Sequence, residues 1–266
     1  MSAFTADWLA MREPYDMRAR NARVLDAATA AFAGRSSIRV VDLACGTGSS
    51  LRAVAPRLPG RQAWKMVDKD RALLDRAARR SYPATTVTTS AVDLARDLES
   101  TLAEPADLIV TSALLDLVSR DWLQRLVSIV VTRQLPFYAA FTYDGCIVLE
   151  PDDPLDAAII EAANEHQLLD KGFGPALGPG APAATTALFE SHGYSLVHGR
   201  ADWKFGPQDR DVQLSILDGW AEVAHELGRL RPPDIQAWLA RRRDVVHSGG
   251  ASMLVGHVDL CAAPMS

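Results

Sequence analysis

Cysteine is scarce in this chain of 266 residues, and its six histidines are scattered. The spacing of the three cysteines, Cys45, Cys146 and Cys261, fits neither a disulfide framework nor a metal site. No two histidines have an H-x-x-x-H or similar ligand spacing. We therefore expect no bound metal and a reducing, cytoplasmic location.

Long apolar runs and an excess of positive charge are also lacking. No window approaches about 18 uncharged apolar residues, so no transmembrane span is expected. The charged N-terminal stretch lacks the apolar core of a signal peptide. A net charge of −5 and a pI near 5.7 argue against a large nucleic-acid footprint, which needs a basic face. The one basic run, residues 241–243, is typical of a solvated helix face.

Short β-rich apolar runs alternate with helical patterns after an N-terminal helical segment at about 5–33. This alternation predicts βαβ units with right-handed crossovers, and hence an α/β fold with a doubly wound, mostly parallel sheet. The expected strands are 38–43, 62–68, 85–90, 107–112, 136–143, 194–200 and 251–261. The expected helices between them are 49–58, 69–80, 119–133, 152–169 and 182–192.

A tight glycine turn follows the first expected strand. Residues 40–48 carry Asp42, Gly46 and Gly48 in the pattern D-x-A-x-G-x-G. Two glycines let the backbone approach a ligand closely, and the helix that follows supplies free N–H groups. The dinucleotide fingerprint G-x-G-x-x-G requires a third glycine where Leu51 stands, so that pattern is broken. A generic nucleotide turn remains the alternative.

Acidic residues follow the next two expected strands. Asp68 lies twenty residues beyond Gly48, a spacing that suits hydrogen bonds to a ribose diol. An N-cap of the following helix is the alternative role for Asp68. Asp93 and Leu94 follow the third strand, where an exposed loop aspartate is the alternative.

Taken together, these features of residues 38–118 resemble the class I S-adenosylmethionine-dependent methyltransferases. The resemblance implies a Rossmann-like, seven-stranded sheet with the last strand antiparallel. It also implies S-adenosylmethionine as cofactor and S-adenosylhomocysteine as product, with Asp68 at the ribose and Asp93 at the adenine amino group. Ala44 stands where glycine is commoner in the family. The residues that the resemblance assigns to the cofactor are Tyr15, Arg20, Asp42, Ala44, Gly46, Gly48, Asp68, Lys69, Asp93, Leu94 and Ser112.

The resemblance also predicts how the chain is divided. Residues 1–34 are expected to form a helical segment that covers the cofactor, since a tyrosine or arginine of such a helix lies near the methionine carboxylate in many relatives; a helix packed on the core is the alternative. Residues 35–266 form the methyltransferase domain. Insertions at about 144–183 and 201–250 are expected at the carboxyl ends of strands, as a helical cap or lid over the substrate. Extra packing helices or a homodimer surface are the alternatives.

Methyl transfer mainly requires two positioned reactants, with an optional general base, so no catalytic residue is assigned. Weak candidates are Tyr143, Asp144 and His166; an imidazole titrates near working pH, although a helix cap or surface residue is the alternative for His166. The expected acceptor-binding residues are Asp116, Tyr143, His166, Lys171, Phe173 and Trp203.

We therefore predict transfer of a methyl group from S-adenosylmethionine to an O or N nucleophile of a small-molecule acceptor. The Asn/Asp-Pro-Pro-Tyr/Phe motif of many amino-directed nucleic-acid methyltransferases is absent after the fourth strand. The alternatives are a protein or RNA methyltransferase, which requires an open basic or extended groove in place of an enclosed pocket, and a cofactor-binding protein without turnover.

Overall fold

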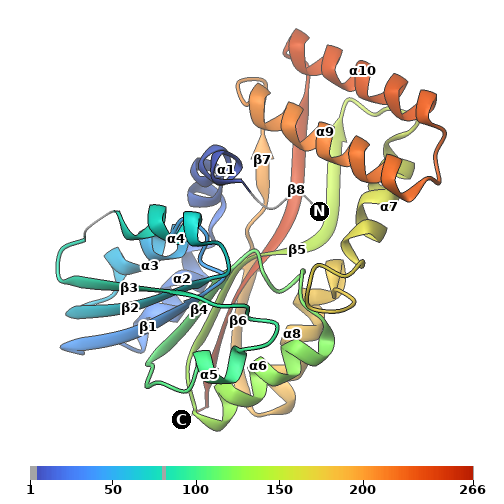
Figure 1. Cartoon of the computed structure of the whole chain (residues 1–266). Helices are drawn as coiled ribbons and strands as arrows, with labels where there is room; N and C mark the ends of the chain where they lie inside the picture. The colour runs from blue at the N-terminus through green and yellow to red at the C-terminus, as the bar shows by residue number, and fades with distance from the viewer. Residues whose placement is uncertain (1–4, 80–81, 266) are drawn as a thin grey trace.

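An eight-stranded sheet dominates the computed structural model, which describes residues 5–79 and 82–265 (Figure 1). The sheet order is β3-β2-β1-β4-β5-β8-β6, with β7 paired to β8 outside this path. The strands are β1 (Ser37–Leu43), β2 (Arg61–Asp68), β3 (Thr85–Ala91), β4 (Leu108–Ser112), β5 (Phe137–Glu150), β6 (Tyr194–Arg200), β7 (Trp203–Phe205) and β8 (Ser252–Pro264).

Strands β1 to β5 pair in parallel, whereas β8 is antiparallel to both β5 and β6. The predicted doubly wound sheet with an antiparallel last strand is therefore confirmed. The predicted number of seven strands is one too few, because the short β7 was not recognised: three residues with a buried-exposed-buried pattern give no period to detect.

Helices cover both faces of the sheet. The packing face of α6 carries Trp122, Leu126 and Val130 at helical spacing, all buried, and Ser119 caps this helix by accepting from the Trp122 amide at 3.2 Å. Because both faces are covered, the central strand β4 is buried over Leu108–Thr111. The helices α2 (Ala22–Ala30), α3 (Ser49–Val54) and α4 (Arg71–Ala78) pack on one face, and α5 (Leu98–Thr101), α6 (Arg120–Thr132) and α8 (Ala181–Ser191) on the other.

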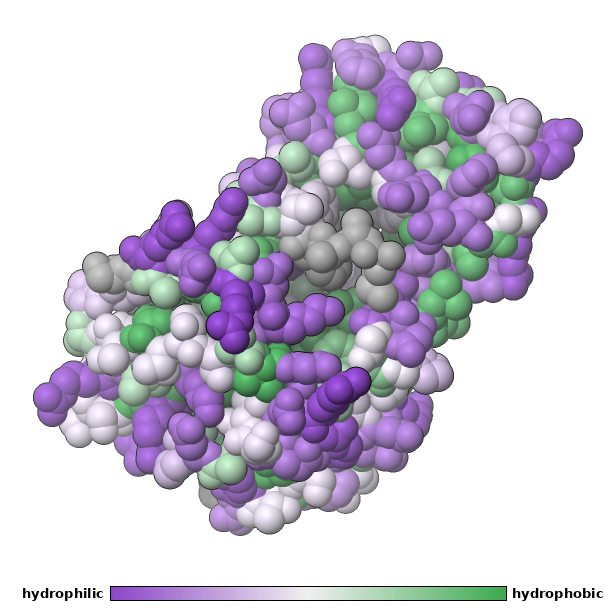
Figure 2. All heavy atoms as spheres, viewed as in Figure 1, coloured by the Kyte–Doolittle hydropathy of each residue, from purple (hydrophilic) through white to green (hydrophobic). Residues whose placement is uncertain are grey.

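A second, smaller lobe stands on a ribbon that continues from the sheet (Figure 1). Strand β5 runs on to Glu150, pairs with the first half of β8, and is joined there by β7. The helices α7 (Asp156–Gln167), α9 (Arg210–Leu227) and α10 (Pro232–Ser248) pack on this ribbon around the fully buried Trp238. Figure 2 shows the surface hollowed between the two lobes.

The expected end of the fifth strand at residue 143 is wrong, because β5 continues to Glu150. Asp144-Gly145 reads as a turn in the sequence. In the fold Gly145 has φ 85° within an irregularity of the ribbon, and the pairing resumes at Ile147 opposite Val255. The strand therefore bends at this point instead of ending.

Other expected boundaries need smaller corrections. The N-terminal segment is two helices, α1 (Ala6–Ala19) and α2, because Asn21 starts a new helix by accepting from the Val24 amide. The expected helix 49–58 is α3 followed by the 3₁₀ turn η1 (Ala55–Arg57), and residue 80 of the expected helix 69–80 lies outside the described residues. Helix α5 and the 3₁₀ turn η2 (Gly178–Gly180) were not predicted. No helix in the described ranges has the length and apolarity to span a membrane.

Candidate active site

The glycine loop, residues 44–48, connects β1 to α3 and has left-handed backbone at three positions: Ala44 (φ 53°), Gly46 (φ 53°) and Gly48 (φ 86°). A Cβ added to Gly48 would lie 3.2 Å from the Met66 side chain, so this position has little room for a larger residue. Both glycines of the sequence pattern therefore stand where the backbone has a positive φ, which glycine adopts without strain.

Asp68, at the end of β2, holds this loop in place. Its Oδ2 accepts from the Gly46 amide at 2.8 Å and its Oδ1 from the Asp70 amide at 2.9 Å. The alternative role of Asp68 as helix cap is wrong, since Asp70 caps α4 by accepting from the Ala72 and Leu73 amides. The carboxylate of Asp68 keeps further lone pairs for a ligand. Lys69, beside it, is exposed.

Asp42 lies beneath the glycine loop with its side chain fully buried. Neither carboxylate oxygen has a hydrogen-bond partner among the described residues. Burial raises the pKa of Asp42 to about 8, against the opposing charge of Arg20. Arg20 itself donates to the Tyr138 hydroxyl at 3.0 Å, while its Nε and Nη2 have no partner in the described part of the chain. Buried donors and acceptors of this kind call for a ligand or ordered water.

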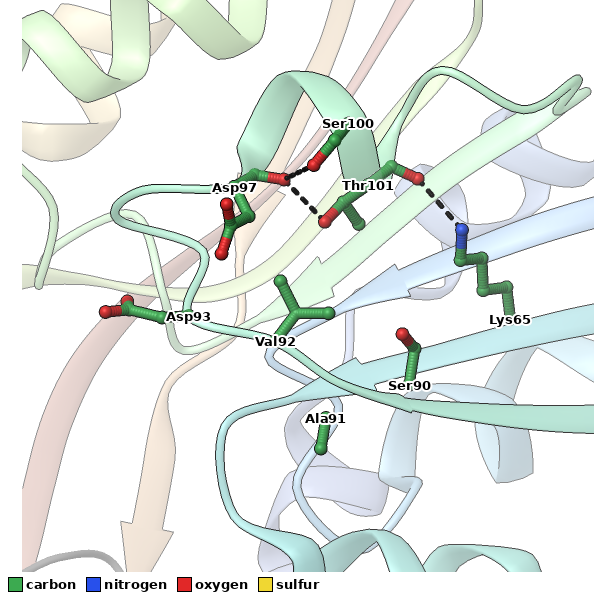
Figure 3. A pocket seen from close by; sticks show the side chains of 8 residues that line it. All are labelled: Lys65, Ser90, Ala91, Val92, Asp93, Asp97, Ser100 and Thr101. Atoms are coloured by element: carbon green, nitrogen blue, oxygen red, sulfur yellow. Dashed lines mark hydrogen bonds between the residues drawn. The ribbon is translucent and has the colours of Figure 1, made fainter.

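A polar pocket of about 300 Å³ borders the end of β3 (Figure 3). Ser90, Val92 and Lys65 rise from the sheet toward α5, and Lys65 donates to the Thr101 carbonyl at 3.1 Å. Asp93 lines this pocket and accepts from the Ala95 amide at 3.1 Å.

Two further cofactor candidates lie near this end of the sheet. Leu94 is 4% exposed and belongs to the main core. The hydroxyl of Ser112, at the end of β4, is buried without a partner among the described residues. Only Ser112 therefore offers an unsatisfied polar group to a ligand.

Helix α1 lies against the glycine loop. A Cβ added to Gly46 would meet the Leu9 side chain at 3.2 Å, and Glu13 forms an ion pair with Arg52, which also donates to the Thr47 carbonyl at 2.6 Å. Tyr15 faces the other lobe. Its hydroxyl donates to Asp209 at 3.1 Å and its ring contacts Phe205 at 4.9 Å between centroids.

The next helical turn of α1 and the second lobe meet in what we call the interlobe cluster: Arg12, Asp116, Tyr143, Trp203 and His257. Arg12 lies over the Trp203 ring at 5.3 Å, and the Trp203 ring lies 4.6 Å from that of His257. His257 contacts the Tyr143 ring at 6.0 Å. The cluster thus contains residues from α1, from the segment after β4, and from β5, β7 and β8.

Most polar groups of the interlobe cluster are satisfied. Arg12 forms an ion pair with Asp16 at 3.0 Å, and Asp16 also accepts from the Trp203 indole at 2.9 Å. Burial lowers the pKa of His257 to about 3, so its ring is neutral, and its Nδ1 donates to the Val255 carbonyl at 3.0 Å. The Tyr143 hydroxyl donates to Asn164 at 2.6 Å.

Asp116 is the exception. Its side chain is 6% exposed, and its Oδ1 has no partner in the described ranges. Burial raises its pKa to about 6, although the Tyr143 amide and the charge of Arg12 oppose the shift. The Thr142 hydroxyl, one residue before Tyr143, is likewise buried and unpartnered there. Asp116 is therefore the member of the interlobe cluster with an unsatisfied polar atom among the described residues.

The loop of residues 170–180 fixes the main chain around Asp116. The Gly178 amide donates to the Asp116 carbonyl at 2.9 Å, and the Leu177 amide to the Val118 carbonyl at 2.8 Å. The loop is folded onto the domain, since Phe173 packs edge-on against Trp122 at 5.4 Å. This engages Phe173 with the core, away from the interlobe cluster.

The remaining acceptor candidates have partners elsewhere. His166 lies between α7 and α9, with one ring nitrogen 3.2 Å from Glu226 and the other 3.2 Å from Lys171. Asp144 contacts Arg200 at 3.2 Å. The structure thus brings together Asp116, Tyr143 and Trp203 from the predicted acceptor set, but not His166, Lys171 or Phe173.

Sequence reasoning missed Arg12, Thr142 and His257. Arg12 and Asp16, at helical i,i+4 spacing, were a detectable pair. No local signal distinguished Thr142 or His257, because their role depends on which strands become neighbours.

The comparisons with known proteins agree with this fold. The methyltransferase domain family matches residues 40–132, while no curated protein sequence matches the chain. A cyclopropane-fatty-acyl-phospholipid synthase-like protein from Lactobacillus casei superposes with a TM-score of 0.55 at 13% identity, covering 97% of this chain and 93% of its own. A proposed type II methyltransferase from Anaeromyxobacter dehalogenans gives a TM-score of 0.51 at 15% identity, with 91% and 94% covered.

Residues 40–132, which match the family, contain the glycine loop, Asp68, Asp93 and the segment after β4. Residues 40–132 therefore carry a methyltransferase domain, and the chain as a whole has the Rossmann-like fold of the solved structures that it resembles. Within the described residues, no group of three histidine, cysteine or acidic side chains is placed to hold a metal ion.

Proposed function

We propose that this protein transfers the methyl group of S-adenosylmethionine to an O or N nucleophile of a small molecule in the cytoplasm. The proposal rests on the position of α1 between the glycine loop and the interlobe cluster. Leu9 of this helix lies against Gly46, and Arg12 lies over the Trp203 ring. One helix thereby touches both the expected cofactor site and the expected acceptor site. The free thiols, Cys45 and Cys261 buried among them, are consistent with a reducing compartment.

The residues present fit the cofactor. The glycine loop offers close backbone approach, Asp68 retains acceptor capacity for a ribose diol, and Asp42 and Ser112 bring buried oxygens without partners in the described ranges. The cofactor supplies an electrophilic methyl group, so the chain's own task is to position the acceptor and exclude water. Helix α1 would act as the cover of this site, held by Glu13 and Arg52.

A small acceptor is favoured over a protein or RNA because the interlobe cluster is buried and aromatic. Tyr143, Trp203 and His257 are each less than a tenth exposed. The basic run 241–243 offers no free cationic patch, since each of its arginines is ion-paired, to Asp153, Asp156 and Asp218 respectively. The basic run 241–243 therefore does not support a groove that binds RNA or an extended protein segment.

Calorimetry on the purified protein tests the cofactor half of the proposal. S-adenosylmethionine and S-adenosylhomocysteine should bind with micromolar affinity, and NAD should not bind. Failure of both ligands to bind a folded sample would contradict the proposal. Release of labelled methyl to a panel of small amines and alcohols, with tRNA and a basic protein in parallel, tests the acceptor class.

A further inference from the structure

The buried carboxylate of Asp116 is only partly satisfied: the Asp116 and Tyr143 amides contact it, but its Oδ1 has no hydrogen-bond partner among the described residues. Arg12 is neutralised by Asp16, and His257 is uncharged. Asp116 nevertheless is 6% exposed, with Oδ1 lacking a hydrogen-bond partner in the described ranges. A buried carboxylate oxygen without a partner is costly, and native proteins retain such groups where a ligand completes them.

The surroundings of Asp116 define the kind of ligand. The Tyr143 amide contacts the Asp116 carboxylate. The charge of Asp116 helps to raise the pKa of the Tyr143 phenol, so the two side chains lie close together. An aromatic ring and a carboxylate both attract a cationic nitrogen, whereas an anionic acceptor would be repelled. A neutral alcohol would satisfy the hydrogen bond but leave the negative charge uncompensated.

We propose that Asp116 binds the amino group of an amine acceptor and accepts its proton, which makes this protein an amine N-methyltransferase. The inference rests on the proposed function. In the first step R–NH3⁺ gives a proton to the Asp116 carboxylate, leaving R–NH2 and a carboxylic acid. The nitrogen lone pair then forms the C–N bond as the C–S bond breaks and its electron pair stays on sulfur. The positive charge passes from the sulfonium to the methylated nitrogen, and Asp116 returns its proton to solvent.

The decisive experiment uses matched amines and alcohols as probes on the 266-residue chain saturated with S-adenosylhomocysteine. Phenethylamine and cyclohexylamine are titrated by calorimetry against 2-phenylethanol and cyclohexanol. The amines should bind at least tenfold more tightly than the alcohols. Asp116→Asn, which keeps the shape and removes the charge, should abolish that preference while changing S-adenosylhomocysteine affinity less than twofold. Asp152→Asn, at an exposed position, is the matched control and should preserve both affinities.

The other outcomes separate the two proposals. If S-adenosylhomocysteine does not bind the wild type, the proposed function fails first. If it binds and the alcohols bind as well as the amines, or neither class binds, amine recognition is overturned while the proposed function stands. If Asp116→Asn weakens S-adenosylhomocysteine binding as much as amine binding, Asp116 belongs to the cofactor site, and the assignment is likewise overturned.

Discussion

The backbone amide of Gly46 donates to the carboxylate of Asp68 at 2.8 Å, which ties the end of β1 to the end of β2 at the point expected to receive the cofactor ribose. Asp68→Ala removes this contact together with the charge-assisted hydrogen bonds expected from the ribose. S-adenosylhomocysteine affinity should fall by about 1–3 kcal/mol, or roughly fivefold to 150-fold. Calorimetry on the folded variant measures the loss.

Asp70→Ala is the control for this substitution. It removes the cap of α4, two residues away, and should lower the free energy of unfolding by about 1 kcal/mol. It should leave cofactor affinity unchanged. Equal affinities for Asp68→Ala and the wild type would refute the ribose role.

Ala44 has φ 53° in the glycine loop, a left-handed conformation that strains an alanine. Ala44→Gly should therefore raise the free energy of unfolding by about 0.5–1 kcal/mol, as seen by urea denaturation. Ala237→Gly, at an exposed position within α10, should lower it by about 1 kcal/mol. If both substitutions lowered the free energy of unfolding by a similar amount, alanine would not strain the backbone at position 44.

The raised pKa of Asp42 makes stability depend on pH. Because the folded pKa of about 8 exceeds the ordinary aspartate value of 3.8, the stabilising contribution is complete below pH 3.8 and is lost progressively as the pH rises to 8. The free energy of unfolding should fall by at most about 1.4 kcal/mol per pH unit in that window. Asp42→Asn should remove this slope.

Urea denaturation of the wild type and Asp42→Asn at several pH values between 5 and 9 gives the difference that belongs to Asp42. The buried Asp116 and His257 titrate in both proteins and cancel in that difference. Parallel curves would mean that Asp42 stays ionised in the folded protein, for example through the neighbouring Arg20.

The sheet could be predicted from sequence because its signals are local. Alternating apolar runs predicted the strands. The glycine turn predicted the edge of the sheet at which the carboxyl ends of β1, β2 and β3 place Asp42, Asp68 and Asp93. The interlobe cluster could not be predicted, because it depends on β5 continuing past Gly145 and on β8 lying beside it. His257 has no periodic or spacing signal, and Arg12 was detectable only as half of an i,i+4 pair. Contacts between distant strands and the N-terminal helix therefore required the fold.

The three arginines at 241–243 differ in burial, and their energetic roles should differ accordingly. The solvated helix face expected from the sequence is wrong for Arg242, which is 4% exposed and paired with Asp156 and with the Pro151 carbonyl at 2.5 Å. Asp156 also accepts from the Trp238 indole at 2.8 Å. Arg242→Ala strands a buried carboxylate and should cost about 3–5 kcal/mol of unfolding free energy.

Arg243→Ala is the matched test of that claim, one residue along the same helix. Its side chain is 46% exposed and its partner Asp218 is 48% exposed, so water screens the pair and the loss should stay below about 1 kcal/mol. Urea denaturation of both variants compares the two costs directly. If the cost for Arg242→Ala were as small as that for Arg243→Ala, the Trp238 indole and the Asp153 amide would have to compensate Asp156. The buried ion pair would then not be what fixes α10 against the end of β5.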